Sequence, residues 1–395
     1  MSFCKKIMFV IGCWLLVSNS ILAQNLVPNP SFETYTTCPQ NATNNIPSAT
    51  PWTGPLINNT DYYNACIAPP TYGSIPFHGV YPHSGNAMAG LWEAFNCAPY
   101  YREYLQAPLA SALLPNNCYY VEFYIIPDTE TRTFANNMAM HFSDTNYVTN
   151  STLQCGASNM VLYLKSHILK FGNPVIINTT WTKISGIYKA IGGENHIILG
   201  NFQDDYNTDS IRWGGSPYPA TYYLVDDVSV IPTDSISMPP YAGKDTTIAF
   251  GDSVFIGQQL YGLHCNWYSN SMLLDTNISG IWVKPNVTTT YIVEQTLCGN
   301  VGYDTVVVTV SPLGINELKN GVMKIYPNPA NDKLFIEQTG NENITEISLF
   351  DIYGKKVITE NKQNELDISS LTEGIYFLQV KTKEHFFTQK IIVQH

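Results

Sequence analysis

Charged residues are scarce in this sequence, and positively charged ones are the scarcer kind. Only 13% of the 395 residues are Asp, Glu, Lys or Arg, and the formal net charge at pH 7 is −11. Amphipathic surface helices usually carry Glu, Lys and Arg on their wet face, and no long segment shows a helical apolar repeat. A nucleic-acid surface needs clustered Lys and Arg to neutralise phosphates. The composition therefore argues against a helical protein and against a nucleic-acid partner.

A long apolar run is also missing beyond the N-terminus. Lys5 and Lys6 precede the apolar stretch 7–17, and the small residue Ala23 precedes Gln24. This order is that of a secretory signal peptide, and the apolar part is too short for a membrane span of about 20 residues. We expect residues 1–23 to be a signal peptide that directs the chain to the periplasm. No transmembrane segment is expected to remain after its removal.

None of the nine cysteines lies in a Cys-x-x-Cys motif. Seven of them follow the expected signal peptide, and cysteines of exported proteins form disulfides more often than they bind metal. We expect three disulfides: Cys38–Cys66, Cys97–Cys118 and Cys265–Cys298. Seven is an odd number, so at least one thiol, for which Cys155 is the candidate, is free or pairs between chains.

Tyrosine (26), glycine (26) and proline (24) are abundant instead. Short β-rich runs recur between turn residues, as they do in sandwiches and jelly rolls. Pro and Gly clusters near 232–243 and 311–321 mark domain boundaries. We therefore predict an all-β chain: an N-terminal jelly-roll β-sandwich (24–232), an Ig-like β-sandwich (240–312) and a small C-terminal β-sandwich (322–395). Trp267, Cys265 and Tyr291 are expected in the Ig-like core.

The C-terminal part contains four motifs in a fixed order: KIYPNPA at 324–330, ISLFDIYGK at 347–355, ISSLTEGIYF at 368–377 and TQKIIV at 388–393. In this order it resembles the type A sorting domain of the type IX secretion system of Bacteroidota. The resemblance implies transport through the outer membrane by the type IX machinery. Removal of the domain, and then release or attachment to lipopolysaccharide, usually follow. We therefore expect a secreted protein or one on the outer-membrane surface.

The N-terminal part opens with NLVPNPSFE at 25–33 and closes with YYLVDDVSV at 222–230. It resembles galactose-binding-like jelly rolls, including carbohydrate-binding modules, and 241–312 resembles the Ig- or PKD-like spacers of the same proteins. The first resemblance implies a structural Ca²⁺ between the first and last strands, because a hard cation prefers several oxygen ligands. The expected ligand candidates are Asn29, Glu33, Asp226 and Asp227. Neighbouring strand residues point to opposite faces, so we expect only one of the two aspartates to bind; the alternative is that these carboxylates cap turns.

Sugar-binding modules stack exposed aromatic rings on their ligands. The candidates for such a platform are Trp52, Tyr62, Tyr63, Trp92, Tyr100, Tyr101 and Trp213. Aromatic residues also fill sandwich cores, so the same rings have a structural alternative. The hypothesis is a non-enzymatic binding protein whose jelly roll holds a polysaccharide or another surface component.

Catalytic patterns are weak. Gly251-Asp252-Ser253 imitates the nucleophile block of a hydrolase, but neither a helix pattern nor an Asp-x-x-His motif follows it. His78 and His83 share a loop without the partners that zinc needs. Paired carboxylates could make a jelly-roll polysaccharide hydrolase or lyase, from Glu93, Glu103, Glu122, Asp128, Glu130 and Asp204. We assign no catalytic residue, and an adhesive or structural surface protein without a small ligand is the third possibility.

Overall fold

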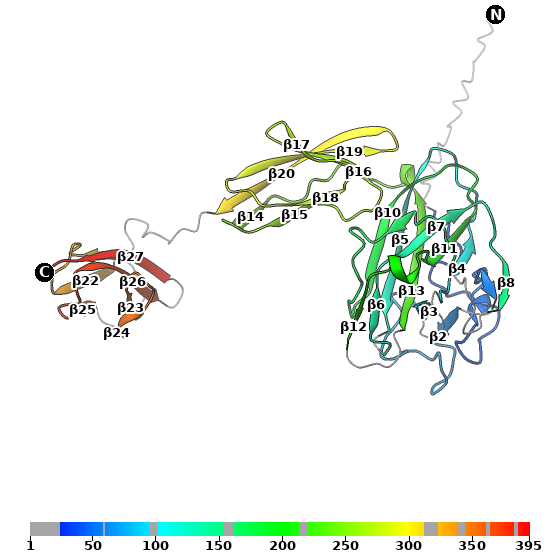
Figure 1. The fold of residues 1–395 in the computed structure, drawn as a ribbon, viewed down its shortest axis with the longest axis horizontal. Helices are drawn as coiled ribbons and strands as arrows, with labels where there is room; N and C mark the ends of the chain where they lie inside the picture. Colours follow the sequence, from blue (N-terminus) through cyan, green and yellow to red (C-terminus); the bar gives the residue numbers. More distant parts are fainter. Residues whose placement is uncertain are drawn as a thin grey trace, which may run out of the picture. The chain divides into compact units, whose positions relative to one another are not determined.

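The computed structural model describes residues 24–57, 60–94, 101–128, 130–152, 161–213, 220–311, 323–338, 344–360, 364–382 and 386–395. The expected signal peptide, Cys97, Tyr100 and Cys155 lie outside these ranges. Within them the regular elements are strands, apart from three 3-10 turns: η1 (Ile46–Ser48), η2 (Asp205–Asn207) and η3 (Thr233–Ser235). The predicted all-β class of packed sandwiches is confirmed (Figure 1). None of the helices in this described part is long and apolar enough to cross a membrane.

The N-terminal sandwich consists of two antiparallel sheets. The first has the order β10 (Thr182–Lys189), β5 (Cys118–Pro127), β13 (Thr221–Pro232), β3 (Ala87–Ala94), β2 (Asp61–Asn64). The second has the order β4 (Leu105–Pro108), β11 (His196–Asn201), β7 (Met138–Ser143), β9 (Ile168–Leu169). Two further sheets have two strands each. One pairs β1 (Leu56–Ile57) with β8 (Thr149–Thr152), and the other pairs β6 (Thr133–Ala135) with β12 (Ser210–Arg212). Side chains such as Leu91, Phe123, Met140, Leu199 and Val225 fill the main core between the two sheets.

The outer face of the five-stranded sheet is also buried. Successive strand residues point to opposite faces, so Tyr62 and Tyr223 enter the main core while Tyr63 and Tyr222 point outward. Phe77, from the segment 65–86, packs on this outer face and creates a second small core. A strand whose two faces are both covered is buried at every position, and β2 is buried at all four of its positions.

The middle sandwich has a five-stranded and a two-stranded sheet. The first has the order β14 (Thr246–Ala249), β20 (Asn300–Ser311), β19 (Thr289–Leu297), β16 (His264–Ser269), β17 (Met272–Asp275), and the second pairs β15 (Val254–Gly257) with β18 (Gly280–Val283). Trp267, Cys265 and Tyr291 are buried here, as expected, and the Trp267 indole donates to the Ile278 carbonyl (3.0 Å). Gly251-Asp252-Ser253 is a turn between β14 and β15, in which the Asp252 amide donates to the Ala249 carbonyl (3.0 Å).

The N-terminal sandwich and most of the middle one form a single compact unit, made of the described residues up to Thr246 with Ser253–Val283 and Thr289–Val308. Tyr261 pairs with the edge of β10: its amide donates to the Ser185 carbonyl (3.0 Å), and its carbonyl accepts the Ile187 amide (2.8 Å). A Cβ on Gly186 would lie 2.5 Å from that Tyr261 carbonyl oxygen. Only glycine therefore allows this backbone approach.

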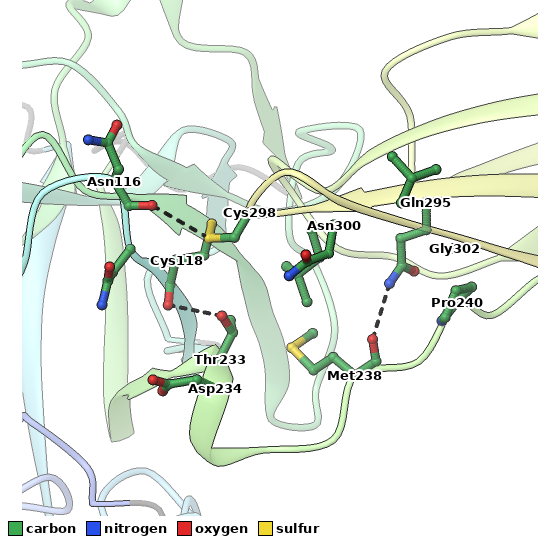
Figure 2. A pocket seen from close by; sticks show the side chains of 13 residues that line it. Asn116, Cys118, Thr233, Asp234, Met238, Pro240, Gln295, Cys298, Asn300 and Gly302 are labelled. Atoms are coloured by element: carbon green, nitrogen blue, oxygen red, sulfur yellow. Dashed lines mark hydrogen bonds between the residues drawn. A yellow bond between two sulfur atoms is a disulfide. The ribbon is translucent and has the colours of Figure 1, made fainter.

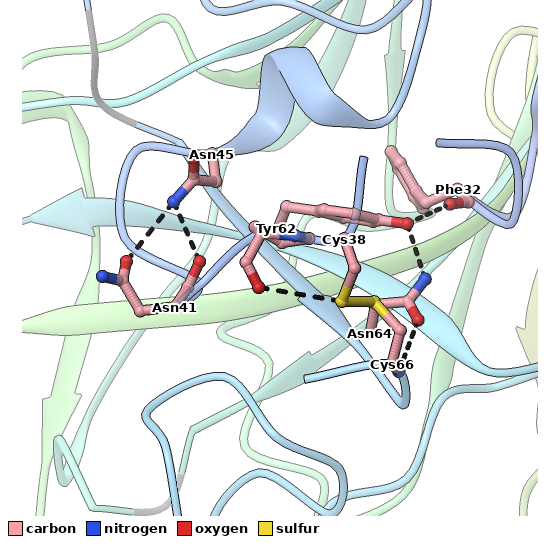
Figure 3. The surroundings of a disulfide bond; sticks show 8 residues. Phe32, Cys38, Asn41, Asn45, Tyr62, Asn64 and Cys66 are labelled. Atoms are coloured by element: carbon pink, nitrogen blue, oxygen red, sulfur yellow. Dashed lines mark hydrogen bonds between the residues drawn. A yellow bond between two sulfur atoms is a disulfide. The ribbon is translucent and has the colours of Figure 1, made fainter. Parts of the chain in front are cut away.

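The disulfides correct two of the predicted pairs. Cys38–Cys66 is confirmed; beside it the Asn64 side chain accepts the Cys66 amide and donates to the Tyr62 hydroxyl (Figure 3). Cys118, however, is bonded to Cys298, 180 residues away, so both Cys97–Cys118 and Cys265–Cys298 are wrong. Cys265 is a buried free thiol. Cys298 lies in the tight β19–β20 turn, and the disulfide holds that turn at Cys118, the first residue of β5.

The second compact unit comprises Thr247–Asp252, Lys284–Thr288 and Thr309–His395. Its C-terminal sandwich packs the sheet β21 (Met323–Tyr326), β22 (Lys333–Gln338), β25 (Glu365–Asp367) on the sheet β24 (Lys356–Glu360), β23 (Ile344–Phe350), β26 (Gly374–Thr382), β27 (Phe386–Val393). The Asn328 amide donates to the Lys390 carbonyl (2.8 Å) and its oxygen accepts the Ile392 amide (2.9 Å). The first and last of the four sorting motifs are thereby tied together.

Candidate functional site

A buried network of acids and tyrosines lies on the outer face of the five-stranded sheet. The Tyr222 hydroxyl donates to Asp61 Oδ2 (2.8 Å) and lies 2.9 Å from the Tyr63 hydroxyl. Asp61 is opposite Gly90 in the strand register, and a Cβ on Gly90 would lie 2.1 Å from the Tyr222 hydroxyl oxygen. Glycine therefore lets the phenol cross the strand to reach the acid. Burial raises the pKa of Asp61 to about 6.

Glu103 extends this network. Its carboxylate accepts the Trp92 amide (3.0 Å) and the Tyr101 hydroxyl (2.9 Å), and the Trp92 ring packs edge-on against Tyr222 (centroids 4.7 Å apart). Burial, and then the negative charge of Asp61, raises the pKa of Glu103 well above its ordinary value. Trp92 and Tyr101, two of the expected sugar-stacking residues, are thus half-buried members of a polar network.

The segment 65–86 is fixed to the same face by two histidine–aspartate contacts. His78 Nδ1 lies 2.9 Å from Asp128 Oδ1, and His83 Nδ1 contacts Asp227 Oδ2. The His83 ring also stacks on Tyr124 at 3.8 Å. The two histidines therefore hold a loop over the sheet.

Three of the four expected calcium ligands converge on residues 83–87. Glu33 Oε1 accepts the Asn86 (2.7 Å) and Ala87 (2.9 Å) amides, and Asp226 Oδ2 accepts the Ser84 amide (3.0 Å). Asp227 accepts the Ser84 hydroxyl (2.6 Å) and contacts the Ser31 hydroxyl.

The fourth expected ligand, Asn29, does not join these three carboxylates. Its side-chain nitrogen donates to the Thr34 and Thr50 carbonyls, and its side-chain oxygen accepts a hydrogen bond from the Thr34 amide.

Burial raises the pKa of fully buried Asp226 to about 8, with a contribution from the charge of Asp227. A bound cation would offset that cost. Within the described ranges, no group of three or more His, Cys, Asp or Glu residues is arranged as a metal site. A cation here would therefore need backbone or water oxygens beside Glu33 and Asp226.

Three predicted stacking residues are core residues instead. Trp52, Tyr62 and Tyr63 are fully buried. The Trp52 indole donates to the Asn29 carbonyl (2.8 Å) and the Tyr62 hydroxyl to the Phe32 carbonyl (2.8 Å). A ring without exposed surface cannot stack on a sugar, so the platform predicted from these three is wrong. Trp213 is 48% exposed, with its ring edge-on to Phe134 (4.9 Å).

Glu93 is the acid in the most unusual surroundings. It is fully buried at an irregularity between β3 and β13, and neither carboxylate oxygen bonds to a described residue. The hydroxyls of Thr133 and Thr221, which belong to neighbouring strands, are also buried without a partner among these residues. Burial raises the pKa of Glu93 to about 8, although the charge of Arg102 opposes the shift. The strand sequence AMAGLWEA indicates that Glu93 is buried. Successive side chains of a strand point to opposite faces, so Glu93 shares the inward face with Ala87, Ala89 and Leu91.

The remaining candidate acids have separate roles. Glu122 accepts the Tyr120 hydroxyl (2.6 Å), Asp204 caps η2 through the Asn207 amide (3.0 Å), and Glu130 is exposed. Asp128 binds His78. Glu93 faces the main core and Glu103 the outer network, so they do not face each other as a catalytic pair would.

Two clefts flank the Cys118–Cys298 disulfide. The first, of about 410 Å³, is lined by Asn116, Asn117, Asp234, Asn300 and neighbouring residues (Figure 2). The second, of about 500 Å³, is lined by Lys165, His167, Tyr188, Lys189, Tyr261, His264 and neighbouring residues. Both volumes are in the range of small-ligand sites.

Comparison with known proteins identifies the C-terminal part alone. No curated protein matches the chain. The similar solved structures include the CD2-binding domain of CD58 (lymphocyte function-associated antigen 3), with 13% identity, coverage of 39% of this chain and 98% of that chain, and a TM-score of 0.16. They also include the fibronectin(III)-like modules of Clostridium thermocellum CbhA, with 13% identity, coverage of 39% and 90%, and a TM-score of 0.16. Residues 324–394, in contrast, match the family described as "Secretion system C-terminal sorting domain", so the chain carries a sorting domain, which supports its export by the type IX secretion system.

Proposed function

We propose that the chain is a non-enzymatic binding protein, secreted or held on the cell surface, whose N-terminal sandwich binds a glycan together with its middle neighbour. The observation that carries this proposal is the 410 Å³ cleft. Among the described residues, the side chains of Asn116, Asn117, Asp234 and Asn300 have no hydrogen-bond partner there. An amide side chain both donates to and accepts from sugar hydroxyls, and a carboxylate accepts from them. The sorting domain supports the location.

A polysaccharide panel tests this function. The mature chain should be retained by at least one neutral or acidic polysaccharide without forming new reducing ends. Replacing Asn116 and Asn300 together with alanine should weaken retention about tenfold, because two hydrogen bonds contribute roughly 0.5–1.5 kcal/mol each. Asn286→Ala, a change at an exposed position outside the cleft, should have no effect.

The other outcomes lead to the alternatives. New reducing ends would make the protein a polysaccharide hydrolase or lyase and direct mutagenesis to its accessible carboxylates. Retention by no polysaccharide would leave an adhesive or structural surface protein.

A structural Ca²⁺ at Glu33 and Asp226 is the second part of the proposal. The support is the convergence of three carboxylates on 83–87 and the burial of Asp226. Calcium in excess of its Kd should raise the melting temperature above that in chelator, since a ligand specific for the folded state stabilises it by about 3 kcal/mol at a hundredfold excess. Glu33→Gln should remove the difference. Equal melting temperatures with calcium and with chelator would rule the site out.

A further inference from the structure

The 500 Å³ cleft is a positively charged site in a negatively charged protein. The chain has 20 Lys and Arg against 31 Asp and Glu, yet Lys165 and Lys189 both line this one cleft. A cleft lined by one sign of charge raises the local concentration of ligands of the opposite sign.

The two ammonium groups are available to a ligand. Lys183, Lys333 and Lys356 each pair with a glutamate, whereas neither Lys165 nor Lys189 forms an ion pair with any residue in the described part of the chain. Burial, and then the positive charges of His141 and Lys165, lowers the pKa of the neighbouring His167 to about 4. The charge of Lys165 therefore reaches His167, whose own ring stays neutral near pH 7.

Glu194 forms no ion pair with the lysines of the cleft. Glu194, whose charge reaches His167, accepts the Tyr188 hydroxyl (2.6 Å) and the Ile191 (2.8 Å) and Gly192 (2.8 Å) amides. These three hydrogen bonds take most of the roughly four acceptor positions of its carboxylate.

The walls of the cleft are held in place from both sandwiches. Tyr188 lies on β10, and its ring lies 4.9 Å from the His167 ring. Tyr261 is bonded through its backbone to Ser185 and Ile187, and the Cys118–Cys298 disulfide borders the same cleft. A wall that is ordered before binding lowers the entropy cost of binding.

We propose that this cleft binds an anionic saccharide, with the acidic group between Lys165 and Lys189 and the sugar ring against Tyr261. Aromatic rings pack on the apolar face of a sugar, and lysine serves as a point charge for an anion. The proposal rests on the glycan-binding function, and it adds a second binding site beside the Cys118–Cys298 disulfide together with the class of glycan that this site takes. A uronate carboxylate and a sulfate ester present the same chemistry to the two lysines.

Calorimetric titration of the mature chain with three oligosaccharides tests the proposal: an oligogalacturonate, a sulfated galactan fragment and a neutral galactan fragment. At least one acidic oligosaccharide should bind about tenfold more tightly than the neutral one, and raising the salt from about 50 mM to 500 mM should weaken its binding. Lys165→Gln with Lys189→Gln should lower that affinity at least about tenfold. The matched control is Lys244→Gln with Lys284→Gln, which makes the same charge change at exposed positions outside the cleft.

The outcomes separate this inference from the proposed function. Preference for the uronate or for the sulfated fragment, lost in the cleft variant alone, supports the proposal and identifies the acidic group. Equal binding of neutral and acidic fragments, or an equal loss in both double variants, overturns it while glycan binding stands. Inorganic sulfate that binds as tightly as the sulfated fragment also overturns it, because the sugar ring would then contribute nothing. Binding of none of the three oligosaccharides also overturns the inference, and retention by the polysaccharide panel then decides the function.

Discussion

Replacing Glu93 with glutamine is expected to leave the free energy of unfolding nearly unchanged near pH 5 and to raise it near pH 9. Glutamine has the shape of the protonated acid and no charge. Glu93 is fully buried and its oxygens have no partner among the described residues. A buried carboxylate without a partner costs several kcal/mol, whereas the protonated acid costs much less. The effect of the substitution therefore depends on the charge state of the wild-type side chain.

The direction in which the free energy of unfolding changes with pH follows from the pKa of Glu93. Burial raises this pKa from 4.5 to about 8 in the folded protein. Between these two values the folded protein holds a proton that the unfolded chain has released. The contribution of Glu93 to stability is therefore complete below pH 4.5 and is lost as the pH rises through about 8. Each pH unit in that interval corresponds to as much as about 1.4 kcal/mol.

Urea unfolding near pH 5, 7 and 9 measures the effect. We expect Glu93→Gln to exceed the wild type by about 2–5 kcal/mol near pH 9 and by under about 1 kcal/mol near pH 5. Comparing the two chains removes the contributions of other groups that titrate in this range, such as Asp61 and Asp226. Glu130→Gln, at an exposed position, is the control and should follow the wild type. A Glu93→Gln chain that is less stable at all three pH values would mean that an ionised Glu93 is held by a cation.

The strands were predictable because their signal is local. Short β-rich runs between turn residues, such as 181–188 and 303–310, predicted the strands, and the order of four motifs placed the sorting domain. The Cys38–Cys66 pair, 28 residues apart, was also accessible from the sequence. Each of these features depends on residues close together in the chain.

The features that sequence reasoning missed depend on how distant segments pack. Cys118 and Cys298 meet where the two sandwiches dock, and the same docking pairs Tyr261 with the edge of β10 beside Gly186. From the sequence, Gly186 resembles an ordinary interruption of a strand, because nothing there shows that the backbone of Tyr261 approaches it.

The buried aromatics were missed for a related reason. Tyr62 and Tyr63 lie in a short segment, DYYN, whose polar ends suggest an exposed loop. The segment 65–86 folds back over the outer face and buries the side of the strand that would otherwise face water. Composition does not show which loop returns to cover a sheet, so it could not distinguish a sugar platform from a second core.

Removing residues 323–395 is expected to stop the protein from crossing the outer membrane. Residues 324–394 match the sorting-domain family, and these strands form a sandwich with its own core. In a bacterium with a type IX system, immunoblots should show the full chain in the medium or on the outer membrane. The shortened chain should accumulate in the periplasm, with the amount outside the cell reduced at least about tenfold, as expected when a receptor-read address is lost. Equal amounts of the two chains outside the cell would contradict the sorting role.

A shorter deletion separates the folded domain from its linear motifs. Removing residues 386–395 deletes β27, uncovers the core by removing Ile391 and Val393, and leaves Asn328 without its two backbone partners. Exposing such a core costs several kcal/mol, enough to unfold a domain of this size. We expect this deletion to block export as completely as loss of the whole domain, whereas Tyr353→Ala, at an 88% exposed turn position, should be exported normally. Normal export of the chain that lacks β27 would show instead that the machinery reads the motifs before β27 as extended sequence and does not require the folded sandwich.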